Sequence, residues 1–546
     1  MKKDIIDALI SAIEASLKSL ALDDLLKEDI LLDYPTDSRF GDLSTNVALK
    51  LSKLAKKSPF EIANSITELI RPHLEEGALK DQVRLVKIEG AGFINFYLTE
   101  KYFFEKLKEI ILKEKEALAH DFGKGKKVLI EFVSANPTGS LSVAHARQAA
   151  VGDCLANILD FLGFEAKREY YLNDEGNQIN ILGGSVGLRM KELSGEKIEF
   201  PENYYQGDYI YTIAKEAAEK KVKTEELGDF AANYILDIIK KELDDFGVKF
   251  DYWYSQKELA KSDKIRNAFE SLKANGFLYE QDGATWFKST AFGDDKDRVV
   301  IKSDGALTYL APDIAYHQDK YKRGFDWLIN LWGPDHHGYI ARLKSSVQAL
   351  GHNAQSLAII IVQLATIFRC GKPVQMSTRK GQYITMREVL DEVGTDAARF
   401  FFLMRRTSSH LDFDLDIAKK QTPENPVYYV QYAHARICSI LRNSIIKVDK
   451  KETDFSLLKE KEELALIKKL LQFTNILNIC LVTLDPYMLT VYLQEVAETF
   501  HRFYDLHRVL GVDDSLTKAR LALIEATKIV IAQGLDLLGV SKPEKM

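Results

Sequence analysis

Cysteine is scarce in this sequence. Four occur among 546 residues, and none stands at the short spacing of a CxxC or CxxH motif. The spacing therefore indicates neither a disulfide framework nor a zinc site. We expect all four to be thiols in the protein core: Cys154, Cys370, Cys438 and Cys480.

Long apolar runs are absent as well. No stretch of about 18 uncharged apolar residues occurs, which argues against a membrane-spanning helix. The N-terminal stretch MKKDIIDALISAIEASL is amphipathic and carries acids, unlike a secretory signal peptide. We therefore expect a cytoplasmic protein with no membrane partner.

An excess of positive charge is missing too. The chain has 74 Lys and Arg against 80 Asp and Glu, a net charge of −6, so it lacks the strongly basic composition of many nucleic-acid binders. RNA binding is not excluded, because an enzyme that holds a folded RNA by its shape can confine its positive charge to one face.

What is present is the composition of a soluble globular protein, with 46% hydrophobic and 28% charged residues. The length predicts about three or four domains. We predict a multidomain α/β protein with an α/β N-terminal domain at 1–118, a nucleotide-binding domain at 119–405 and an all-α C-terminal bundle at 406–546.

The predicted nucleotide-binding domain rests on a strand–helix–strand pattern. The apolar run at 128–132 leads through a small-residue loop into a helix that ends near Gly163, and a second strand follows; this order predicts a parallel sheet. Alternation returns at 298–317 and 326–343, where the second half of a split Rossmann-like fold would fit. Charged helical patterns and bulky aromatics at about 185–295 favour an insertion over a continuation of the sheet.

The loop at residues 134–142, called the first loop below, joins that strand to that helix. A helix N-terminus has free N–H groups and the positive end of the helix dipole, which suits a bound phosphate. The loop offers Gly139, Ser140 and Ser142, with Ala144 and His145 just inside the helix, and His145 can donate to phosphate oxygens. The alternative is a capped helix with Ser140 or Ser142 as N-cap and His145 as a surface residue.

Two further stretches suggest nucleotide chemistry. In GKPVQMSTRKGQYITMREVL at 371–390, the cations Lys372, Arg379 and Lys380 flank two hydroxyls, so the loop can close over a triphosphate and stabilise the leaving pyrophosphate. The alternative is a solvated basic turn.

GPDHHGY at 333–339 places two His at the C-terminal end of a strand, where α/β sheets bind ligands. A metal site there is less favoured, because no third ligand stands at a diagnostic spacing.

These elements and their longer context resemble the arginyl-tRNA synthetases, a family of class I aminoacyl-tRNA synthetases. The similar stretches run in the family's order over essentially the whole chain. They are FGDLSTNVAL, GAGFINFYL, EFVSANPTG with HARQAAVGD, EYYLNDEGNQI, KSDGALTYLAPDIAYH, GPDHHGY, VGTDAARFFFLMRR, NPVYYVQYAHARICSI, and RFYDLHRVL with LLGV. Several are weak individually, but eight or more in order are hard to obtain by chance.

The resemblance implies a reaction in two steps. L-Arginine and ATP form arginyl-adenylate and pyrophosphate, and the arginyl group then passes to the 3′-terminal ribose of tRNA(Arg). Members of the family generally need bound tRNA even for the first step. The implied cofactor is ATP with Mg²⁺, with no further metal, and we expect a monomer, as for most of the family.

The resemblance also implies an arginine pocket. Glu131 and Asp313 match the acids that bind the guanidinium group, which requires planar carboxylate partners in a desolvated site. Tyr309 matches a neighbouring tyrosine, while Asn136 and the backbone at Ser134 match positions that hold the α-amino group. Without the family context, Glu131 reads as a surface acid at a strand end and Asp313 as a helix N-cap.

The implied ATP-binding residues include the second His of the family's HIGH-type signature, which is His145. The sequence departs at Ser142 and Ala144, where the first His and the Gly of that signature would stand, and in the KMSK-type loop, where Gln375 and Thr378 replace two lysines. The candidate catalytic residues are His145, Ser142, Lys380 and Arg379. The candidate ATP contacts are Gly139, Ala144, His145, Asp335, His336, His337, Met376 and Ser377.

Both ends of the chain are implied to bind tRNA. Phe93 and Asn95 are candidates for stacking on and hydrogen bonding to an unstacked base of the D-loop. Tyr428, Tyr432 and Arg436 fall on one face of a helix that matches the anticodon-binding helix, and we assign Tyr428 and Arg436 to RNA. The alternative for these aromatics is a place in a protein core.

Three functions are compatible with these observations. The predicted function is an arginine–tRNA ligase. The departures at Ser142, Ala144, Gln375 and Thr378 keep open a catalytically weak or silent paralogue that binds tRNA, although such a protein would not need the two guanidinium-binding acids. A nucleotidyltransferase for a small acid would share the phosphate loop but would not need the helical domain, so tRNA binding separates it from the others.

Overall fold

The computed structural model describes residues 5–22, 30–35, 37–77, 79–374 and 384–546. The chain divides into two compact units. One comprises Met1–Leu118, Ile437–Phe473 and Glu498–Val530, and the other comprises Ala119–Arg436, Thr474–Ala497 and Ile531–Met546. Both units draw on the C-terminal helices, so the domain boundaries at 118/119 and 405/406 remain predictions.

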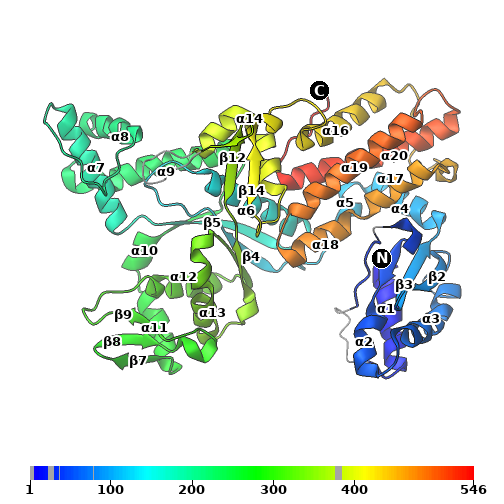
Figure 1. Cartoon of the computed structure of the whole chain (residues 1–546), viewed down its shortest axis with the longest axis horizontal. Coiled ribbons are helices and arrows are strands. Elements are labelled where there is room, and N and C mark those ends of the chain that lie inside the picture. The colour runs from blue at the N-terminus through cyan, green and yellow to red at the C-terminus, as the bar shows by residue number, and fades with distance from the viewer. Residues whose placement is uncertain (1–4, 23–29, 36, 78, 375–383) are drawn as a thin grey trace. The chain divides into compact units, whose positions relative to one another are not determined.

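The N-terminal segment of the first unit is an α/β fold (Figure 1). Its antiparallel sheet has the order β1-β3-β2, formed by Leu43–Thr45, Phe93–Leu98 and Val83–Glu89. The helices are α1 (Ile5–Ser19), α2 (Val47–Ala55), α3 (Pro59–Glu75), α4 (Glu100–Lys113) and α5 (Lys115–Leu118). Helix α3 begins at a capping box, in which the Glu61 carboxylate accepts from the backbone N–H of Ser58 at 3.0 Å.

The second unit is built on a five-stranded parallel sheet, as the strand–helix–strand pattern predicts. Its order is β11-β10-β4-β5-β6. The strands are β4 (Lys127–Glu131), β5 (Glu165–Leu172), β6 (Tyr252–Ser255), β10 (Trp327–Trp332) and β11 (Leu357–Ile361). The strand order reverses between β4 and β10, and in open α/β sheets such a switch point is where ligands bind, at the carboxyl ends of the strands.

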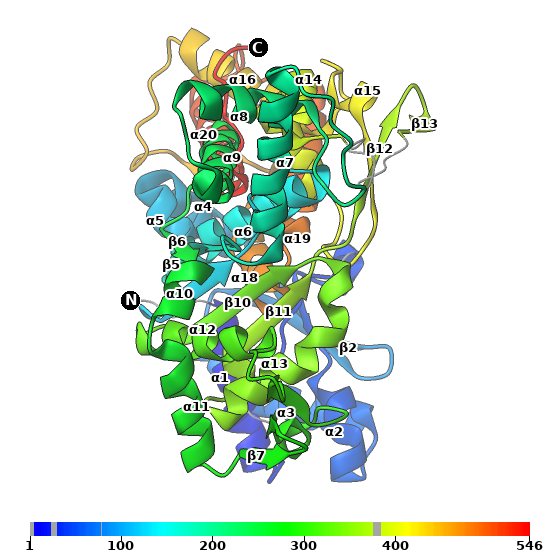
Figure 2. The ribbon, with the colours of Figure 1, turned by 90° about the vertical axis from the view of Figure 1, so that its left-hand side faces the viewer.

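Helices cover both faces of this sheet (Figures 1 and 2). On one face, Phe132 packs against α6 (Val143–Phe161), where an added Cβ at Gly152 would lie 2.3 Å from the Phe132 ring. On the other face, Leu129 packs with Leu343 of α13 (Ile340–Ala349), and α12 (Leu310–Lys322) lies beside α13. Since strand side chains alternate, Glu131 points to the same face as Leu129.

The expected insertion at about 185–295 is wrong in one respect. The chain leaves the sheet as α7 (Asn177–Leu193), α8 (Asp208–Glu219) and α9 (Leu227–Asp245), but it returns at β6, which pairs with β5. The aromatics of β6 belong to the sheet, because Trp253 stacks on Tyr170. A second excursion follows, with α10 (Gln256–Lys261), α11 (Lys264–Ala274) and an antiparallel sheet of β7 (Leu278–Gln281), β8 (Ala284–Phe287) and β9 (Arg298–Ile301). The alternation at 298–301 therefore forms β9 of this small sheet and not a strand of the main one.

The rest of the chain is mainly helical, as expected. A third small sheet contains β12 (Ala365–Arg369), β13 (Lys372–Pro373) and β14 (Leu411–Asp414). The helices are α14 (Met386–Leu403), α15 (Leu415–Ala418), α16 (Pro426–Asn443), α17 (Lys461–Leu471), α18 (Phe473–Thr483), α19 (Tyr487–Leu506) and α20 (Asp514–Leu538). Among the described residues, the segment Lys461–Thr483 is long and apolar enough to cross a membrane by length and composition alone. Its Leu466, Leu470 and Leu477 are fully buried in the protein, so we interpret it as packed helices.

The cysteines are all free thiols, as expected. Cys154, Cys438 and Cys480 are buried. The prediction of a core position is wrong for Cys370, which is exposed where the chain turns between β12 and β13. A left-handed backbone at Cys370, with φ of 51°, fits this tight turn.

Candidate functional site

The two predicted guanidinium-binding acids lie together at the switch point of the sheet. Glu131 ends β4 and is buried, with 8% of its surface exposed, and Asp313 stands in the first turn of α12. Tyr339 donates its hydroxyl to Asp313 Oδ2 at 2.5 Å, and Lys320 Nζ donates to Glu131 Oε2 at 2.5 Å. The alternative assignments are wrong, because Glu131 is not on the surface and the N-cap of α12 is Tyr309.

The pKa of the Asp313 carboxyl group lies near neutral pH. Burial raises the pKa of Asp313 to about 7, with a further contribution from the charge of Glu131, while Tyr339 and Lys320 act in the opposite direction. The carboxyl group of Asp313 therefore changes its protonation near neutral pH. An arriving guanidinium would favour the carboxylate form, because an opposite charge at close range stabilises it.

Three buried residues of this pocket were not predicted from the sequence. Lys320 bonds Glu131, and Asn330 on β10 bonds both Lys320 at 3.2 Å and His317 at 2.9 Å. The signal was present in α12, where Asp313, His317 and Lys320 recur at spacings of three and four and so share one helix face. Asn330 gave no such signal, because only the pairing of β10 with β4 brings it beside Glu131.

The start of the first loop has a strained backbone. Val133 and Ser134 both adopt positive φ, 68° and 42°, and this conformation is uncommon for a β-branched residue. Ser134 Oγ accepts the backbone N–H of Tyr171 at 3.1 Å, and Asn136 Nδ2 donates to Gln178 Oε1 of α7 at 2.7 Å. These contacts fix the two positions that were assigned to the α-amino group of arginine.

Tyr309 is not brought into this cluster. Its side chain is 88% exposed, so it does not pack against the acids in this structure. A part in arginine binding remains a prediction for Tyr309.

At the other end of the first loop, His145 begins helix α6. The backbone N–H of Ser142, which is the N-cap residue, donates to His145 Nδ1 at 3.1 Å. Burial lowers the pKa of His145 to about 4, so the ring is neutral at pH 7. Because Nδ1 is the acceptor, the proton is on Nε2, which can donate to a phosphate oxygen. His145 can therefore cap the helix through Nδ1 and still donate a hydrogen bond through Nε2. Gly139 and Ala144 flank this position and are partly buried.

Arg147, two residues after His145 in α6, is a structural residue that the sequence did not reveal. Its guanidinium is fully buried and donates to the carbonyl oxygens of Gln363, Ser409 and Arg406 at 2.7, 2.9 and 3.0 Å. Burial lowers the pKa of Arg147 to about 10, so it stays charged at pH 7. It ties the helix that carries His145 to the segments around β12 and β14.

The end of the cationic stretch is anchored on the first loop. Its residues Gln375, Met376, Ser377, Thr378, Arg379, Lys380 and Gly381 lie outside the described residues. At its far side, Thr385 forms a β-bridge with Ser142, and the N–H of Met386 donates to the Leu141 carbonyl at 2.8 Å. Lys372, at the near side, is an exposed residue of β13.

The two adjacent His follow β10 directly, as predicted. They lie in a short 3₁₀ helix, Pro334–Tyr339, in which Asp335, His336 and His337 are exposed. His336 Nε2 is 3.3 Å from Asp335 Oδ2. Among the described residues, no group of three or more His, Cys, Asp or Glu side chains could hold a metal ion, so the metal-site alternative has no support in that part of the chain.

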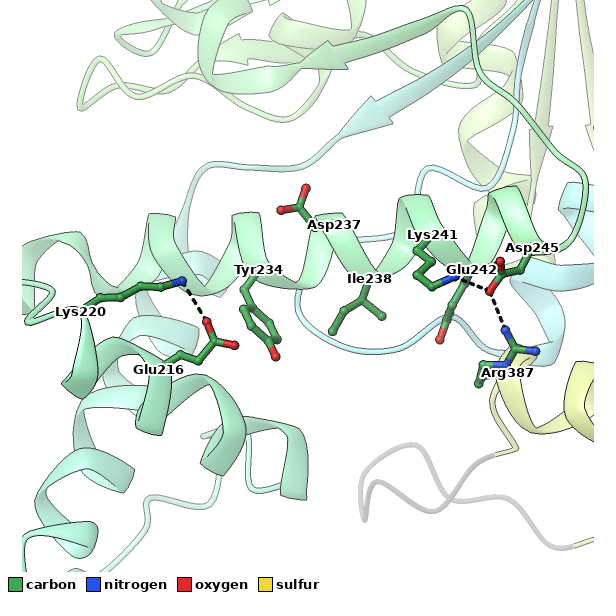
Figure 3. Close-up of a pocket in the computed structure, with 9 residues that line it drawn as sticks. All are labelled: Glu216, Lys220, Tyr234, Asp237, Ile238, Lys241, Glu242, Asp245 and Arg387. Atoms are coloured by element: carbon green, nitrogen blue, oxygen red, sulfur yellow. Dashed lines mark hydrogen bonds and ion pairs between the residues drawn. The ribbon is translucent and has the colours of Figure 1, made fainter.

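Helix α9 borders the first loop from the other side. Glu242 accepts the backbone N–H of Leu141, and Asp245 pairs with Arg387 of α14 at 2.9 Å. Figure 3 shows Arg387 and Lys241 both directed at Asp245, beside a cavity of about 500 Å³. The cavity is lined by Glu216, Lys220, Tyr234, Asp237, Ile238, Lys241, Glu242, Asp245 and Arg387. The first loop is thus held by α9 and by the start of α14.

Comparison with known proteins agrees with this geometry. The sequence model of the arginyl tRNA synthetase N terminal domain matches residues 7–98, that of the class I (R) tRNA synthetase catalytic domain matches 106–408, and that of the DALR anticodon binding domain matches 430–546. An arginine–tRNA ligase of Geobacter sp. (strain M21) is 48% identical over 531 residues, 95% of each chain.

The chain belongs to the arginyl-tRNA synthetase family.

Other relatives extend this result. An arginine–tRNA ligase of Listeria monocytogenes is 45% identical over 547 residues, covering 98% of this chain and 97% of that protein. The arginyl-tRNA synthetase of Thermus thermophilus shares the fold over the full length of both chains, with a TM-score of 0.78 at 21% identity. The prediction of an arginyl-tRNA synthetase with a class I catalytic domain and a helical anticodon-binding domain is confirmed. Nothing in these comparisons supports the weak or silent paralogue.

The tRNA-binding candidates of this synthetase occupy different surroundings. Phe93 is 43% exposed at the start of β3, whereas Asn95 is buried and its Oδ1 accepts the Ser44 hydroxyl at 2.6 Å. Phe93 therefore has a free face for stacking, and the amide oxygen of Asn95 is engaged within its own sheet. Both assignments to RNA remain predictions.

The candidates on α16 form a ladder on one helix face, as their spacing predicts. The rings of Tyr428 and Tyr432 are stacked with centroids 6.1 Å apart, and Arg436 donates to the Tyr432 hydroxyl at 3.1 Å. All three side chains are partly exposed. Such a ladder presents an aromatic face and a cation together, which is a combination that suits RNA bases.

Proposed function

We propose that the chain activates L-arginine with ATP and transfers the arginyl group to the 3′-terminal ribose of tRNA(Arg). The observation that carries this proposal is the pair of acids at the switch point. One oxygen of each acid makes a short hydrogen bond of 2.5 Å to a protein donor, Glu131 Oε2 to Lys320 and Asp313 Oδ2 to Tyr339. Glu131 Oε1, which the Ser134 hydroxyl contacts only at 3.4 Å, and Asp313 Oδ1 would receive the two sides of a planar guanidinium.

The α-amino end of arginine would lie at the start of the first loop. The side chain of Asn136 and the backbone at Ser134 are held there by Gln178 and Tyr171. With the guanidinium at the acids, the carboxylate of arginine would face the N-terminus of α6, where ATP phosphates bind. Holding both reactants in this way would supply much of the rate enhancement for attack of the arginine carboxylate on the α-phosphate, with pyrophosphate as the leaving group.

The phosphates of ATP would bind at the N-terminus of α6. Gly139 and Ala144 allow a close approach, and His145 Nε2–H donates to the phosphate that accumulates charge as pyrophosphate leaves. Asp335, His336 and His337 would contact the nucleotide from the end of β10. We propose that residues of the cationic stretch also contact ATP, although they lie outside the described residues: Met376, Ser377, Arg379 and Lys380.

Mg²⁺ would enter with ATP. The described residues offer no cluster of three carboxylate, thiolate or imidazole ligands, whereas Mg²⁺ commonly keeps water ligands and binds through substrate phosphates. The ion would supply positive charge to the phosphate oxygens, and the chain's own residues would orient the two substrates.

Phe93 and Asn95 are proposed for the tRNA D-loop, and Tyr428 and Arg436 for the anticodon arm. We further propose that the enzyme is a cytoplasmic monomer without a membrane partner. Sedimentation of the pure protein with and without tRNA tests its association state.

The proposed function is tested by charging bulk tRNA with each of the 20 amino acids. We expect incorporation of arginine alone, dependent on ATP. Asp313→Asn should keep the fold and lose most of the activity at low arginine, because it removes one carboxylate from a desolvated guanidinium site. Tight tRNA binding without charging would instead favour the silent paralogue.

A further inference from the structure

A buried chain of hydrogen bonds runs from the Glu131 carboxylate to the backbone carbonyl of Asp313. His317 Nδ1 lies 2.8 Å from the Asp313 carbonyl oxygen, and Asn330 Nδ2 lies 2.9 Å from His317 Nε2. Lys320 Nζ then donates to Asn330 Oδ1 at 3.2 Å and to Glu131 Oε2 at 2.5 Å. Burial lowers the pKa of His317, so the ring is neutral. The Asn330 amide donates to Nε2, which leaves the proton on Nδ1 to bond Asp313.

Lys320 is held completely within this chain. Its side chain is fully buried, and its ammonium also lies over the Tyr316 ring, 4.2 Å from the centroid. The ammonium, which has three N–H donors, thus has three partners: Glu131, Asn330 and the Tyr316 ring. If the ammonium moved away from these partners, the buried Glu131 carboxylate would lose its paired charge.

The neighbouring acid on β5 does not compete for Lys320. Glu169 pairs with Glu131 in the sheet register, but Arg323 binds it with two bonds, at 2.5 and 2.9 Å. Tyr316 donates its hydroxyl to the same carboxylate at 2.6 Å. Glu169 is therefore already neutralised, and Lys320 serves Glu131.

The charge of the pocket follows from these pairings. Two carboxylates, Glu131 and Asp313, face one resident cation, Lys320, so the empty pocket has one negative charge when both acids are ionised. One guanidinium brings the total to zero. Without Lys320, the same guanidinium would leave one buried carboxylate unbalanced, which is costly in a desolvated site.

We propose that Lys320 is a specificity-determining residue: its buried ammonium neutralises Glu131, so that the two acids together present a single negative charge to a single guanidinium group. The proposal rests on the proposed function, because it assumes that arginine binds at these acids. Lys320 acts through Glu131, and it need not touch the substrate.

The pH dependence of arginine binding reports this balance. The groups that face Asp313 are Glu131 on β4, Tyr171 on β5, His317 and Lys320 on α12, and Tyr339 with Arg342 beyond it. Burial raises the pKa of Tyr171 and Tyr339 far above neutrality, so both stay uncharged. Besides burial and the hydrogen bond from Tyr339, the charge of Glu131 raises the pKa of Asp313 and the charge of Lys320 lowers it.

The test compares variants that change the charge of this one site in steps. The dissociation constant of L-arginine is measured by calorimetry from pH 5.5 to 9 for the parent, Lys320→Met, Glu131→Gln and the double variant. In the parent, affinity should reach its plateau just above pH 7. Lys320→Met should move this transition up by one pH unit or more, and Glu131→Gln should move it down, because each leaves the opposite charge unbalanced beside Asp313. The double variant should bind less tightly but have its transition near that of the parent.

A matched control separates this effect from general damage. Arg520 and Glu463 form another buried pair, with Nε to Oε1 at 2.7 Å, in the first unit. Arg520→Met should lower the melting temperature and leave the pH transition unmoved. Variants at Lys320 and Glu131 that weaken binding with an unmoved transition would overturn the proposal. If Lys320→Met does not fold, the double variant decides the matter: removing Lys320 from the Glu131→Gln background should bring the transition back up toward that of the parent. A parent that binds no arginine at any pH would refute the proposed function instead.

Discussion

The backbone N–H of Met386 donates to the carbonyl oxygen of Leu141 at 2.8 Å. This bond joins the end of the cationic stretch to the first loop, although 244 residues separate them in the sequence, and the bridge between Thr385 and Ser142 lies beside it. The two stretches that the sequence singled out for phosphate chemistry therefore meet at the N-terminus of α6.

Arginine affinity should depend on pH through Asp313. The pKa of Asp313 is raised to about 7, and the guanidinium needs the carboxylate form. The dissociation constant at pH 6 should be about tenfold higher than at pH 8, as expected for a single group of that pKa. Asp313→Asn should bind weakly at both values. An affinity that is flat between pH 6 and 8 in the parent would show that Asp313 does not meet the guanidinium.

Ionisation of Asp313, which should favour arginine binding, should lower the free energy of unfolding of the protein. Asp313 has a folded-state pKa above its unfolded value, so its contribution is fully present below about pH 4 and is lost as the pH rises through 7. In Asp313→Asn the side chain at this position does not ionise, so stability is not lost there as the pH rises. The variant's melting temperature should exceed that of the parent by roughly 2–4 °C at pH 8 and by less at pH 5. Thermal unfolding followed by circular dichroism measures this, and an equal difference at both pH values would contradict the assignment.

His145 can be tested separately as a helix cap and as a donor. His145→Ala should lower the rate of arginine-dependent pyrophosphate exchange by roughly tenfold to a thousandfold, because the neutral Nε2–H no longer steadies phosphate charge. His145→Glu is the matched variant, since Glu at this position of a helix can accept the N-cap N–H as His145 does but has no N–H to donate. A normal rate in the Glu variant would mean that His145 acts only as a cap.

Gly152 should tolerate no side chain. A Cβ there would lie 2.3 Å from the Phe132 ring, and both residues are buried. Gly152→Ala should cost about 1–3 kcal/mol of unfolding free energy, as overpacking of a core does. Gly187→Ala is the control, because its Cβ would find its nearest neighbour, Leu227 Cδ1, at an ordinary 3.4 Å. Chemical denaturation of both variants gives the comparison, and equal stability of the two would exclude the close packing of α6 on β4.

Local patterns were enough to predict much of this fold. Apolar alternation and helical spacing predicted β4, α6, β5 and β10, and the family's motifs singled out Glu131 and Asp313, which the fold brings close together. The edge strand β6 was missed, because it has only four residues, three of them aromatic, and lies between two helical excursions. Cys370 was misplaced since a turn residue carries no periodic signal.

The contacts within the pocket were harder to predict. Glu131, Asn330 and Asp313 lie on separate stretches, and only the register of β10 on β4 places Asn330 beside Glu131. The buried Lys320 resembles an ordinary solvated lysine in the sequence, and the exposed Tyr309 shows the converse, a predicted pocket residue that the helix start directs outward.

Arginine-dependent exchange of labelled pyrophosphate into ATP, with and without tRNA, tests the account most directly. We predict exchange that requires arginine, that appears when tRNA is added, and that is strongly reduced in both Asp313→Asn and His145→Ala. Absence of exchange in the presence of arginine, ATP, Mg²⁺ and bound tRNA would contradict the assignment of this site to arginine activation.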